Sequence, residues 1–236
     1  MIAINNCKIG YSSVLFSIEN MQLYKGEIYA LIGSNGAGKS TFFSTLTKQI
    51  TPIDGTINID TEKLITYSAK ELAKKIAFVQ SKSDLPDFLT VQAYLELGRT
   101  PYTTIFGRLS KNDRQIIENI VNRLNIESFL TKYMHNLSDG ERQIMAIGRA
   151  LIQDTPIVIL DEPTAFLDYG NRVKIIQLLK EIAEKENKCI LFSSHDIELC
   201  LETIQNIIYI DFVEKKMVLT HNIEKEALIQ QAFPTN

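Results

Sequence analysis

The chain has 236 residues, of which 45% are hydrophobic and 22% are charged, a composition typical of an ordinary globular protein. The net charge of −3 provides no basic surface for a nucleic acid, so we expect no nucleic-acid partner. No apolar run approaches the roughly 20 residues that a bilayer requires, and no basic segment precedes the apolar first residues. We therefore expect no transmembrane segment, no signal peptide and a chain that stays in the cytoplasm.

The first 80 residues predict mainly strands. Apolar and polar residues alternate in the first strands, and later apolar runs are bounded by turn residues such as glycine and proline. In chain order the predicted strands are 2–9, 14–18, 27–32, 56–59 and 76–79, and the predicted helices are 39–48 and 69–75. A glycine-rich turn at 33–38 separates the third strand from the first helix.

Residues 81–153 change to a pattern of helices and loops. Thr90 is expected to cap one helix, and Asn112 or Asp113 to open another that ends at Leu124. This region interrupts the alternation of strands and helices, so it is interpreted as an inserted helical subdomain.

The alternation returns after residue 153. The predicted strands are 157–160, 189–192 and 207–210, and the predicted helices are 171–186 and 196–203. Strands that alternate with helices imply parallel pairing with right-handed crossovers. We therefore expect one α/β domain over 1–236, in which 1–80 and 154–236 form the α/β core and 81–153 the insertion.

The turn after the third strand matches the GxxxxGK[ST] pattern, followed by a threonine. The matching residues are Gly33, Ser34, Asn35, Gly36, Ala37, Gly38, Lys39, Ser40 and Thr41. Glycines let backbone N–H groups face phosphate oxygens, and the helix N-terminus adds partial positive charge. Lys39 would reach the β- and γ-phosphates, and the Ser40 hydroxyl would bind Mg²⁺. A plain glycine-rich turn with a solvated lysine is the alternative, but the strand–turn–helix context predicts a bound nucleoside triphosphate.

Polar residues follow three of the predicted strands at one edge of the sheet. Asp161 would hold Mg²⁺, and Glu162 would orient and polarise the attacking water. His195 could contact the γ-phosphate, and the amide of Gln80 could reach Mg²⁺ and the water. Taken singly, each could instead be an ordinary polar residue that closes a strand.

The segment Leu137–Gln143, with the sequence LSDGERQ, resembles the LSGGQ-type signature of ABC ATPases. From the residues alone, Ser138 and Glu141 form a capping box that opens a helix over 144–152. A capped helix N-terminus also attracts anions. The resemblance implies that Ser138, Gly140 and Glu141 face the γ-phosphate held by a second copy, so that two copies complete each site.

The resemblance to ABC ATPases covers nearly the whole chain. It implies a P-loop NTPase parallel-sheet core with N-terminal antiparallel strands, ATP and Mg²⁺ as cofactors, and a homodimer. The matching residues beyond the phosphate loop and the signature are Tyr11 for adenine stacking, Gln80 for the Q-loop, Asp161 and Glu162 for the Walker-B pair, Asp168 for the D-loop and His195 for the switch histidine.

Asp139 departs from the signature pattern, because it stands where the family has its first glycine. Glycine permits a close approach of the backbone to phosphate, whereas an aspartate that faced the nucleotide would repel it. We expect the Asp139 side chain to point away from the nucleotide, toward the helix N-terminus, which favours acids.

The segments 89–91 (LTV), 97–102 (LGRTPY) and 107–110 (GRLS) resemble the helical subdomain of ATPases that serve iron-siderophore, haem and cobalamin importers. The resemblance implies permease subunits that dock on this subdomain, a substrate-binding protein as an indirect partner, and a position at the cytoplasmic face of the cell (inner) membrane. From the residues alone, 98–101 is a helix C-cap followed by a loop. The sequence does not identify the cargo, because such an ATPase does not touch it.

Other functions fit parts of this pattern. A soluble ABC ATPase without a pore, as in iron–sulfur cluster assembly, is disfavoured by the 98–110 segment, and an importer ATPase for another cargo remains open. A nucleotide-gated scaffold without turnover is disfavoured because both Glu162 and His195 are present. A nucleic-acid ATPase is disfavoured by the acidic charge balance.

Overall fold

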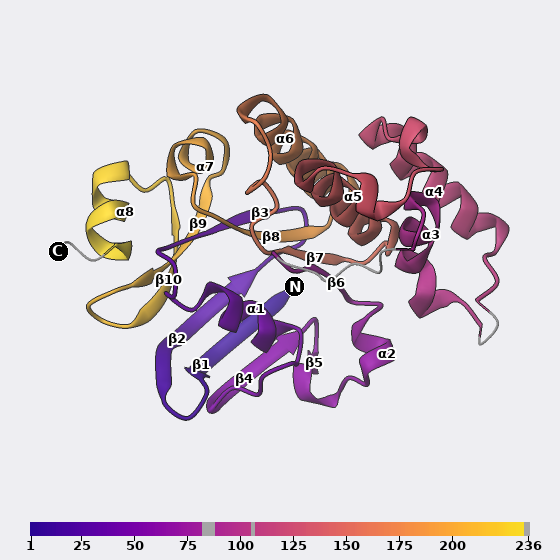
Figure 1. The fold of residues 1–236 in the computed structure, drawn as a ribbon. Helices are drawn as coiled ribbons and strands as arrows, with labels where there is room; N and C mark the ends of the chain where they lie inside the picture. The colour runs from indigo at the N-terminus through magenta and orange to yellow at the C-terminus, as the bar shows by residue number, and fades with distance from the viewer. Residues whose placement is uncertain (82–87, 105–106, 234–236) are drawn as a thin grey trace.

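The computed structural model describes residues 1–81, 88–104 and 107–233, and in these ranges the strands form one ten-stranded sheet (Figure 1). Its order is β5-β4-β1-β2-β10-β9-β3-β8-β7-β6. The strands are β1 Ile2–Gly10, β2 Val14–Leu23, β3 Ile28–Ile32, β4 Asp54–Ile59, β5 Glu62–Lys63, β6 Ile76–Val79, β7 Ile157–Leu160, β8 Cys189–Ser194, β9 Asn206–Asp211 and β10 Lys216–His221. The α-helices are α1 Lys39–Leu46, α2 Ala69–Leu72, α3 Val91–Glu96, α4 Lys111–Leu124, α5 Asp139–Ile152, α6 Tyr169–Glu186, α7 Ile197–Thr203 and α8 Lys225–Ala232.

The strands β9, β3, β8, β7 and β6 are parallel and buried on both faces. Alternate residues of β3 enter different cores: Ala30 faces the core of α5, α6 and α7, and Leu31 faces that of α1. A strand covered on both sides needs apolar residues at every position, which explains the uninterrupted apolar runs.

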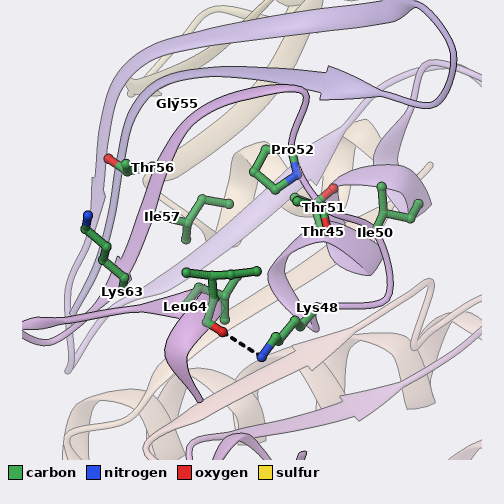
Figure 2. A pocket seen from close by; sticks show the side chains of 11 residues that line it. Thr45, Lys48, Ile50, Thr51, Pro52, Gly55, Thr56, Ile57, Lys63 and Leu64 are labelled. Atoms are coloured by element: carbon green, nitrogen blue, oxygen red, sulfur yellow. Dashed lines mark hydrogen bonds between the residues drawn. The ribbon is translucent and has the colours of Figure 1, made fainter. Parts of the chain in front are cut away.

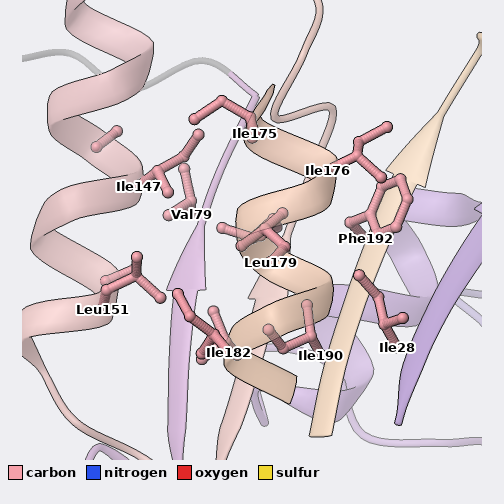
Figure 3. Close-up of a cluster of buried hydrophobic side chains, with 14 of the residues drawn as sticks. Ile28, Val79, Ile147, Leu151, Ile175, Ile176, Leu179, Ile182, Ile190 and Phe192 are labelled. Carbon is pink, nitrogen blue, oxygen red and sulfur yellow. The ribbon is translucent and has the colours of Figure 1, made fainter. Parts of the chain in front are cut away.

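The first core lies between the parallel strands and the helices α5 and α6 (Figure 3). Leu179 stands at its centre, fully buried between Leu151 of α5 and Ile190 of β8. Each fully buried leucine or isoleucine contributes about 1.5–3 kcal/mol relative to an exposed one. These contacts fix the helices against the sheet whose edge carries the site.

The second core lies on the opposite face, where β1, β2 and β4 pair antiparallel and enclose α1. Phe42, Phe43 and Leu46 of α1 are all buried against this layer. The predicted α/β fold, with a parallel core, N-terminal antiparallel strands and helices inserted between β6 and β7, is therefore confirmed.

Several predicted boundaries were wrong. The helix α4 begins at Lys111 with Ser110 as its cap, not at Asn112 or Asp113, because Asp113 instead completes the capping box with Ser110. Residues 97–102 form a 3-10 helix rather than a cap and a loop. The strand β2 extends to Leu23, five residues beyond its predicted end.

A cavity of about 200 Å³ lies between the C-terminal end of α1 and the strand β4 (Figure 2). Thr45 and Lys48 line it from the helix side, and Ile57 and Leu64 from the opposite side. The Lys48 Nζ donates a hydrogen bond of 2.8 Å to the carbonyl of Ile65. The cavity therefore lies at the far end of α1 from the phosphate loop.

No helix within the described ranges is long and apolar enough to cross a membrane.

A buried ion pair joins three helical segments between β6 and β7. The Arg99 Nε lies 2.7 Å from the Asp113 Oδ1 of α4, and the Arg99 Nη1 donates to the carbonyl of Ile152 at 3.0 Å. Both charged side chains are less than a tenth exposed. Hydrogen bonds from Ser110, together with the Arg99 guanidinium, hold the pKa of Asp113 below its usual value.

Replacing Asp113 with alanine would leave Arg99 buried without its acid. We expect the free energy of unfolding to fall by about 3–5 kcal/mol, the usual loss when one member of a buried ion pair is removed. The matched control is Glu181→Ala, which removes the exposed partner of Lys185 and should cost less than about 0.5 kcal/mol. Urea unfolding measures both, and equally small losses would refute the importance of the buried pair.

Because the folded pKa of Asp113 is lowered, its contribution is fully present above about pH 4, the unfolded pKa. The contribution is lost as the pH falls through the lower folded pKa.

Candidate functional site

The phosphate loop, residues 33–38, connects β3 to α1, and Lys39, Ser40 and Thr41 form the first turn of that helix. Gly38 caps the helix with φ of 107°, in the left-handed region that favours glycine. A Cβ at this position would stand 2.7 Å from a ring carbon of Phe16 on β2. Glycine is therefore required here both by conformation and by close packing.

Lys39 is buried inside this loop, with 5% of its surface exposed. Its Nζ donates hydrogen bonds to the carbonyls of Gly33 at 2.8 Å and Ser34 at 3.1 Å. Burial lowers the pKa of Lys39, while the nearby charges of Glu162 and Asp161 act in the opposite direction. The ammonium group thus lies where the loop and the helix N-terminus favour phosphate oxygens.

Asp161 follows β7 and lies against the first turn of α1. The Ser40 Oγ donates to the Asp161 Oδ2 at 2.9 Å, and the Ser193 Oγ donates to its Oδ1 at 2.6 Å. A serine hydroxyl and a carboxylate are the hard oxygen ligands that Mg²⁺ prefers, alongside water and phosphate. The residues present therefore fit Mg²⁺, as the sequence predicts for Ser40 and Asp161.

Glu162 is held in an unusual backbone conformation next to His195. Its φ is 52°, a left-handed conformation that is strained for a residue other than glycine. Its backbone N–H donates to the Ser193 Oγ at 2.8 Å, and its Oε1 lies 2.5 Å from the His195 Nε2. A cavity of about 180 Å³ opens beside this pair, large enough for water.

Gln80 and Tyr11 lie at the margins of this cluster. Gln80 directly follows β6, whose last residue, Val79, pairs with Leu160 at the end of β7. Its side chain is exposed and makes no hydrogen bond with another described residue. Tyr11, in the turn between β1 and β2, is 68% exposed. Neither residue is hydrogen-bonded to Asp161 or Glu162 in the described parts of the chain.

The segment Ser138–Glu141 opens α5, and the predicted capping box is present. The Ser138 backbone N–H donates to the Glu141 Oε2 at 2.7 Å, and the Ser138 Oγ accepts from the Glu141 N–H at 3.3 Å. Hydrogen bonds from Ser138 also lower the pKa of Glu141. The Asp139 Oδ1 accepts from the Arg142 Nη2 at 2.5 Å within the same helical turn, so a neighbouring cation compensates its charge.

Asp168 caps α6 next to that segment. Its Oδ1 accepts from the backbone N–H of Asn171 at 2.9 Å. A Cβ on Gly140 would stand 3.0 Å from the carbonyl oxygen of Phe166, so the start of α5 packs closely against the residues before Asp168. The structure therefore brings Gly140 together with residues 166–168, the Asp168 segment, on one surface.

Within the ranges that the structure describes, no hydrogen bond joins Ser138, Gly140 or Glu141 to the phosphate loop, Asp161 or Glu162. One copy thus carries two separate groups of predicted site residues. The first is the phosphate loop with Asp161, Glu162 and His195. The second is the start of α5 with the Asp168 segment.

Two residues of the site were missed by the sequence analysis. Arg172 donates from its Nε to the carbonyl of Leu167 at 2.8 Å, and its Nη1 lies 3.4 Å from the Asp196 Oδ2, so it joins the Asp168 segment to the residue after His195. Ser193 contacts both Asp161 and Glu162. A hydroxyl at the end of an apolar strand was the available signal for Ser193.

The family model described as ABC transporter matches residues 17–165 of the chain. An uncharacterized ABC transporter ATP-binding protein of Methanocaldococcus jannaschii is 35% identical over 237 residues, covering 100% of this chain and 77% of that protein. The petrobactin import ATP-binding protein FpuD of Bacillus anthracis is 35% identical over 191 residues, covering 81% of this chain and 70% of FpuD.

Solved structures show the same fold. The dimeric structure of a bacterial ABC transporter cassette superposes with a TM-score of 0.81 at 27% identity, covering 95% of this chain and 100% of that one.

Replacing Lys39 with alanine should weaken the binding of nucleoside triphosphate, because the loop loses its buried cation. A hydrogen bond to a charged group contributes about 1.5–3 kcal/mol, so we expect affinity to fall roughly 10- to 100-fold. Titration calorimetry with ATP would measure this loss of affinity. Lys48→Ala, at the other end of α1, is the matched control and should leave affinity nearly unchanged. Unchanged affinity in Lys39→Ala would contradict the assignment of the loop.

Proposed function

The chain belongs to the ABC transporter ATP-binding family, and from this premise we propose that two copies close around ATP and drive a separate permease that imports an iron-siderophore complex, haem or cobalamin. It is an ATPase of that family, so hydrolysis of ATP is coupled to transport. The proposal covers the roles of individual residues, the homodimer, the contacts with the permease and the class of cargo.

The observation that carries the proposal is the convergence of Lys39, Ser40, Asp161, Glu162 and His195 at one edge of the sheet. Lys39 would bind the β- and γ-phosphates, and the loop N–H groups would hold the remaining phosphate oxygens. Ser40 and Asp161 would hold Mg²⁺, which when bound would neutralise charge on the phosphates.

Glu162 would act as the general base that orients the attacking water, since its carboxylate faces the cavity beside His195. His195 would fix that carboxylate and contact the γ-phosphate. Gln80, at the end of the next strand, would join the Mg²⁺ and water contacts, and Tyr11 would stack on the adenine. The strained backbone of Glu162 is consistent with a functional position, because such strain is concentrated at active sites.

The second group of residues supports a site shared between two copies. The capped N-terminus of α5 is a surface that favours anions, and Gly140 lies beside the segment that leads to Asp168. In a head-to-tail pair, Ser138, Gly140 and Glu141 of one copy would face the γ-phosphate bound by the other. ATP would then hold the pair closed, and hydrolysis would release it.

The inserted helical subdomain, residues 81–153, would receive the permease, and a substrate-binding protein would take part indirectly. The permease would place the chain at the cytoplasmic face of the cell membrane. Petrobactin import is named for one similar protein and iron(3+)-hydroxamate import for another, and these names, with the LGRTPY segment, support an iron-chelate cargo. Co-purification of the chain with a permease would test this part of the proposal.

Glu162→Gln should bind Mg²⁺-ATP and accumulate as a closed dimer, because the composite site forms but the water is not activated. Light scattering after size exclusion should show the mass rise from 26.8 kDa to about twice that value, the mass of the two-fold dimer expected for such an assembly. ADP, or ATP with the double variant Lys39→Ala/Glu162→Gln, should leave a monomer. Hydrolysis by Glu162→Gln at the wild-type rate would show that Glu162 is not the base.

Asp139→Gly tests whether the altered signature slows turnover. Because Arg142 already compensates the Asp139 charge, we expect steady-state phosphate release to change only a few-fold, a barrier change below about 1 kcal/mol. The control is Arg142→Ala, which leaves Asp139 uncompensated and should slow turnover. A large acceleration in Asp139→Gly would identify Asp139 as a brake.

A further inference from the structure

Ser193, near the end of β8, is the one residue in the described chain whose side chain bonds to both acids of the proposed site. It is fully buried. Its Oγ lies 2.6 Å from the Asp161 Oδ1 and 2.8 Å from the Glu162 backbone nitrogen. One bond falls on the Asp161 carboxylate and the other on the Glu162 backbone N–H, and neither falls on the backbone of its own strand.

The chemistry of the hydroxyl fixes the direction of both bonds. A serine hydroxyl has one proton to donate and two lone pairs to accept with. The Glu162 N–H can only donate, and the Asp161 carboxylate can only accept. The chain of bonds therefore runs in one direction, from the Glu162 N–H through the Ser193 hydroxyl to the Asp161 Oδ1.

Each bond constrains a different acid. The bond to the Asp161 Oδ1 fixes the plane of that carboxylate, which leaves the Oδ2 facing the Ser40 Oγ at 2.9 Å. The bond from the Glu162 N–H holds a backbone with φ of 52° that would otherwise relax, and this conformation places the Glu162 carboxylate on His195.

A buried hydroxyl with only a structural role makes its hydrogen bond outside the site. Thr155, two residues before the start of β7, also carries a buried hydroxyl, and its Oγ1 donates to the backbone carbonyl of Ile157 at 2.7 Å. That bond pairs the hydroxyl with the backbone of β7 and involves no residue of the site. Thr155 is therefore a matched reference for the loss of a buried hydroxyl.

We propose that Ser193 is a positioning residue of ATP hydrolysis, which sets the Asp161 carboxylate for Mg²⁺ and the Glu162 carboxylate for the attacking water through one hydroxyl. This inference rests on the roles proposed above for Asp161 and Glu162. Ser193 itself would touch neither nucleotide nor water. Its effect passes through the two acids.

Removing the hydroxyl frees both acids. In Ser193→Ala the Asp161 carboxylate can rotate, so more Mg²⁺ is needed for half-maximal rate. The Glu162 N–H loses its buried acceptor, so the base leaves its aligned position. We expect kcat to fall about 10-fold or more, corresponding to the loss of one well-made hydrogen bond at the reacting centre. The affinity for ATP measured in EDTA should stay within about twofold, since the phosphate loop is intact.

The experiment compares Ser193→Ala, Ser193→Thr and Thr155→Val by phosphate release over a Mg²⁺ titration, with thermal unfolding measured in parallel. Ser193→Ala should lose rate and require about threefold or more additional Mg²⁺. Ser193→Thr keeps the hydroxyl, so it should recover most of the rate and most of the affinity for Mg²⁺. Thr155→Val should lower the unfolding temperature without changing kcat or the Mg²⁺ requirement.

The proposal is overturned if Ser193→Ala is less stable but keeps wild-type kcat and Mg²⁺ dependence when assayed below its unfolding temperature. If Ser193→Ala does not fold, Ser193→Cys takes its place in the same assay. A cysteine has a similar volume, but its thiol is only a weak hydrogen-bond donor. Glu162→Gln and Asp161→Asn are measured beside it. If they retain turnover, the roles of the acids are wrong; if they are inactive and Ser193→Ala is normal, only the role of Ser193 is wrong.

Discussion

The parallel pairing of β7 with β8 is the constraint on which the site depends. Leu160 pairs with Phe192, so the residues that follow, Asp161 and Ser193, lie side by side at the carboxyl edge of the sheet. A slip of one residue would turn every side chain of β8 to the other face and would carry the Ser193 hydroxyl away from both acids. The apolar cores on the two faces of these strands prevent that slip, because Ile190 and Leu191 must enter different cores.

The helix α5 connects two regions for which separate roles are proposed. Ser138 caps its first turn, which contains Gly140, and its last residue, Ile152, accepts a hydrogen bond from the buried Arg99. Between these ends, its apolar face packs on the parallel sheet through residues such as Ile147. A helix fixed at both ends in this way transmits a displacement along its length with little bending, since packed interiors deform little.

The sequence predicted the order of the strands along the chain, the phosphate loop and the capping box of α5, because these depend on local patterns. It did not predict β5, β10 or α8. The strand β10 forms a hairpin with β9, which directly precedes it, but it also pairs with β2, which lies far away along the chain. The cap of α4 was misplaced because Ser110, Asn112 and Asp113 are all good capping residues. The link from Ser193 to Asp161 could not be predicted, because it requires the register between two strands separated by α6.

The position of β10 has a consequence for synthesis on the ribosome. In the sheet order, β2 meets the parallel strands through β10, by a single paired position, Lys216 with Ser17. The strands β1, β2 and β4 can therefore pair early, but the edge of β2 stays open until residues 216–221 have emerged. An open strand edge is a template for pairing with other chains, and partly folded chains aggregate through such edges. Most of the elongation time thus passes with one edge unprotected, and a pause late in translation would be more harmful to this chain than an early one.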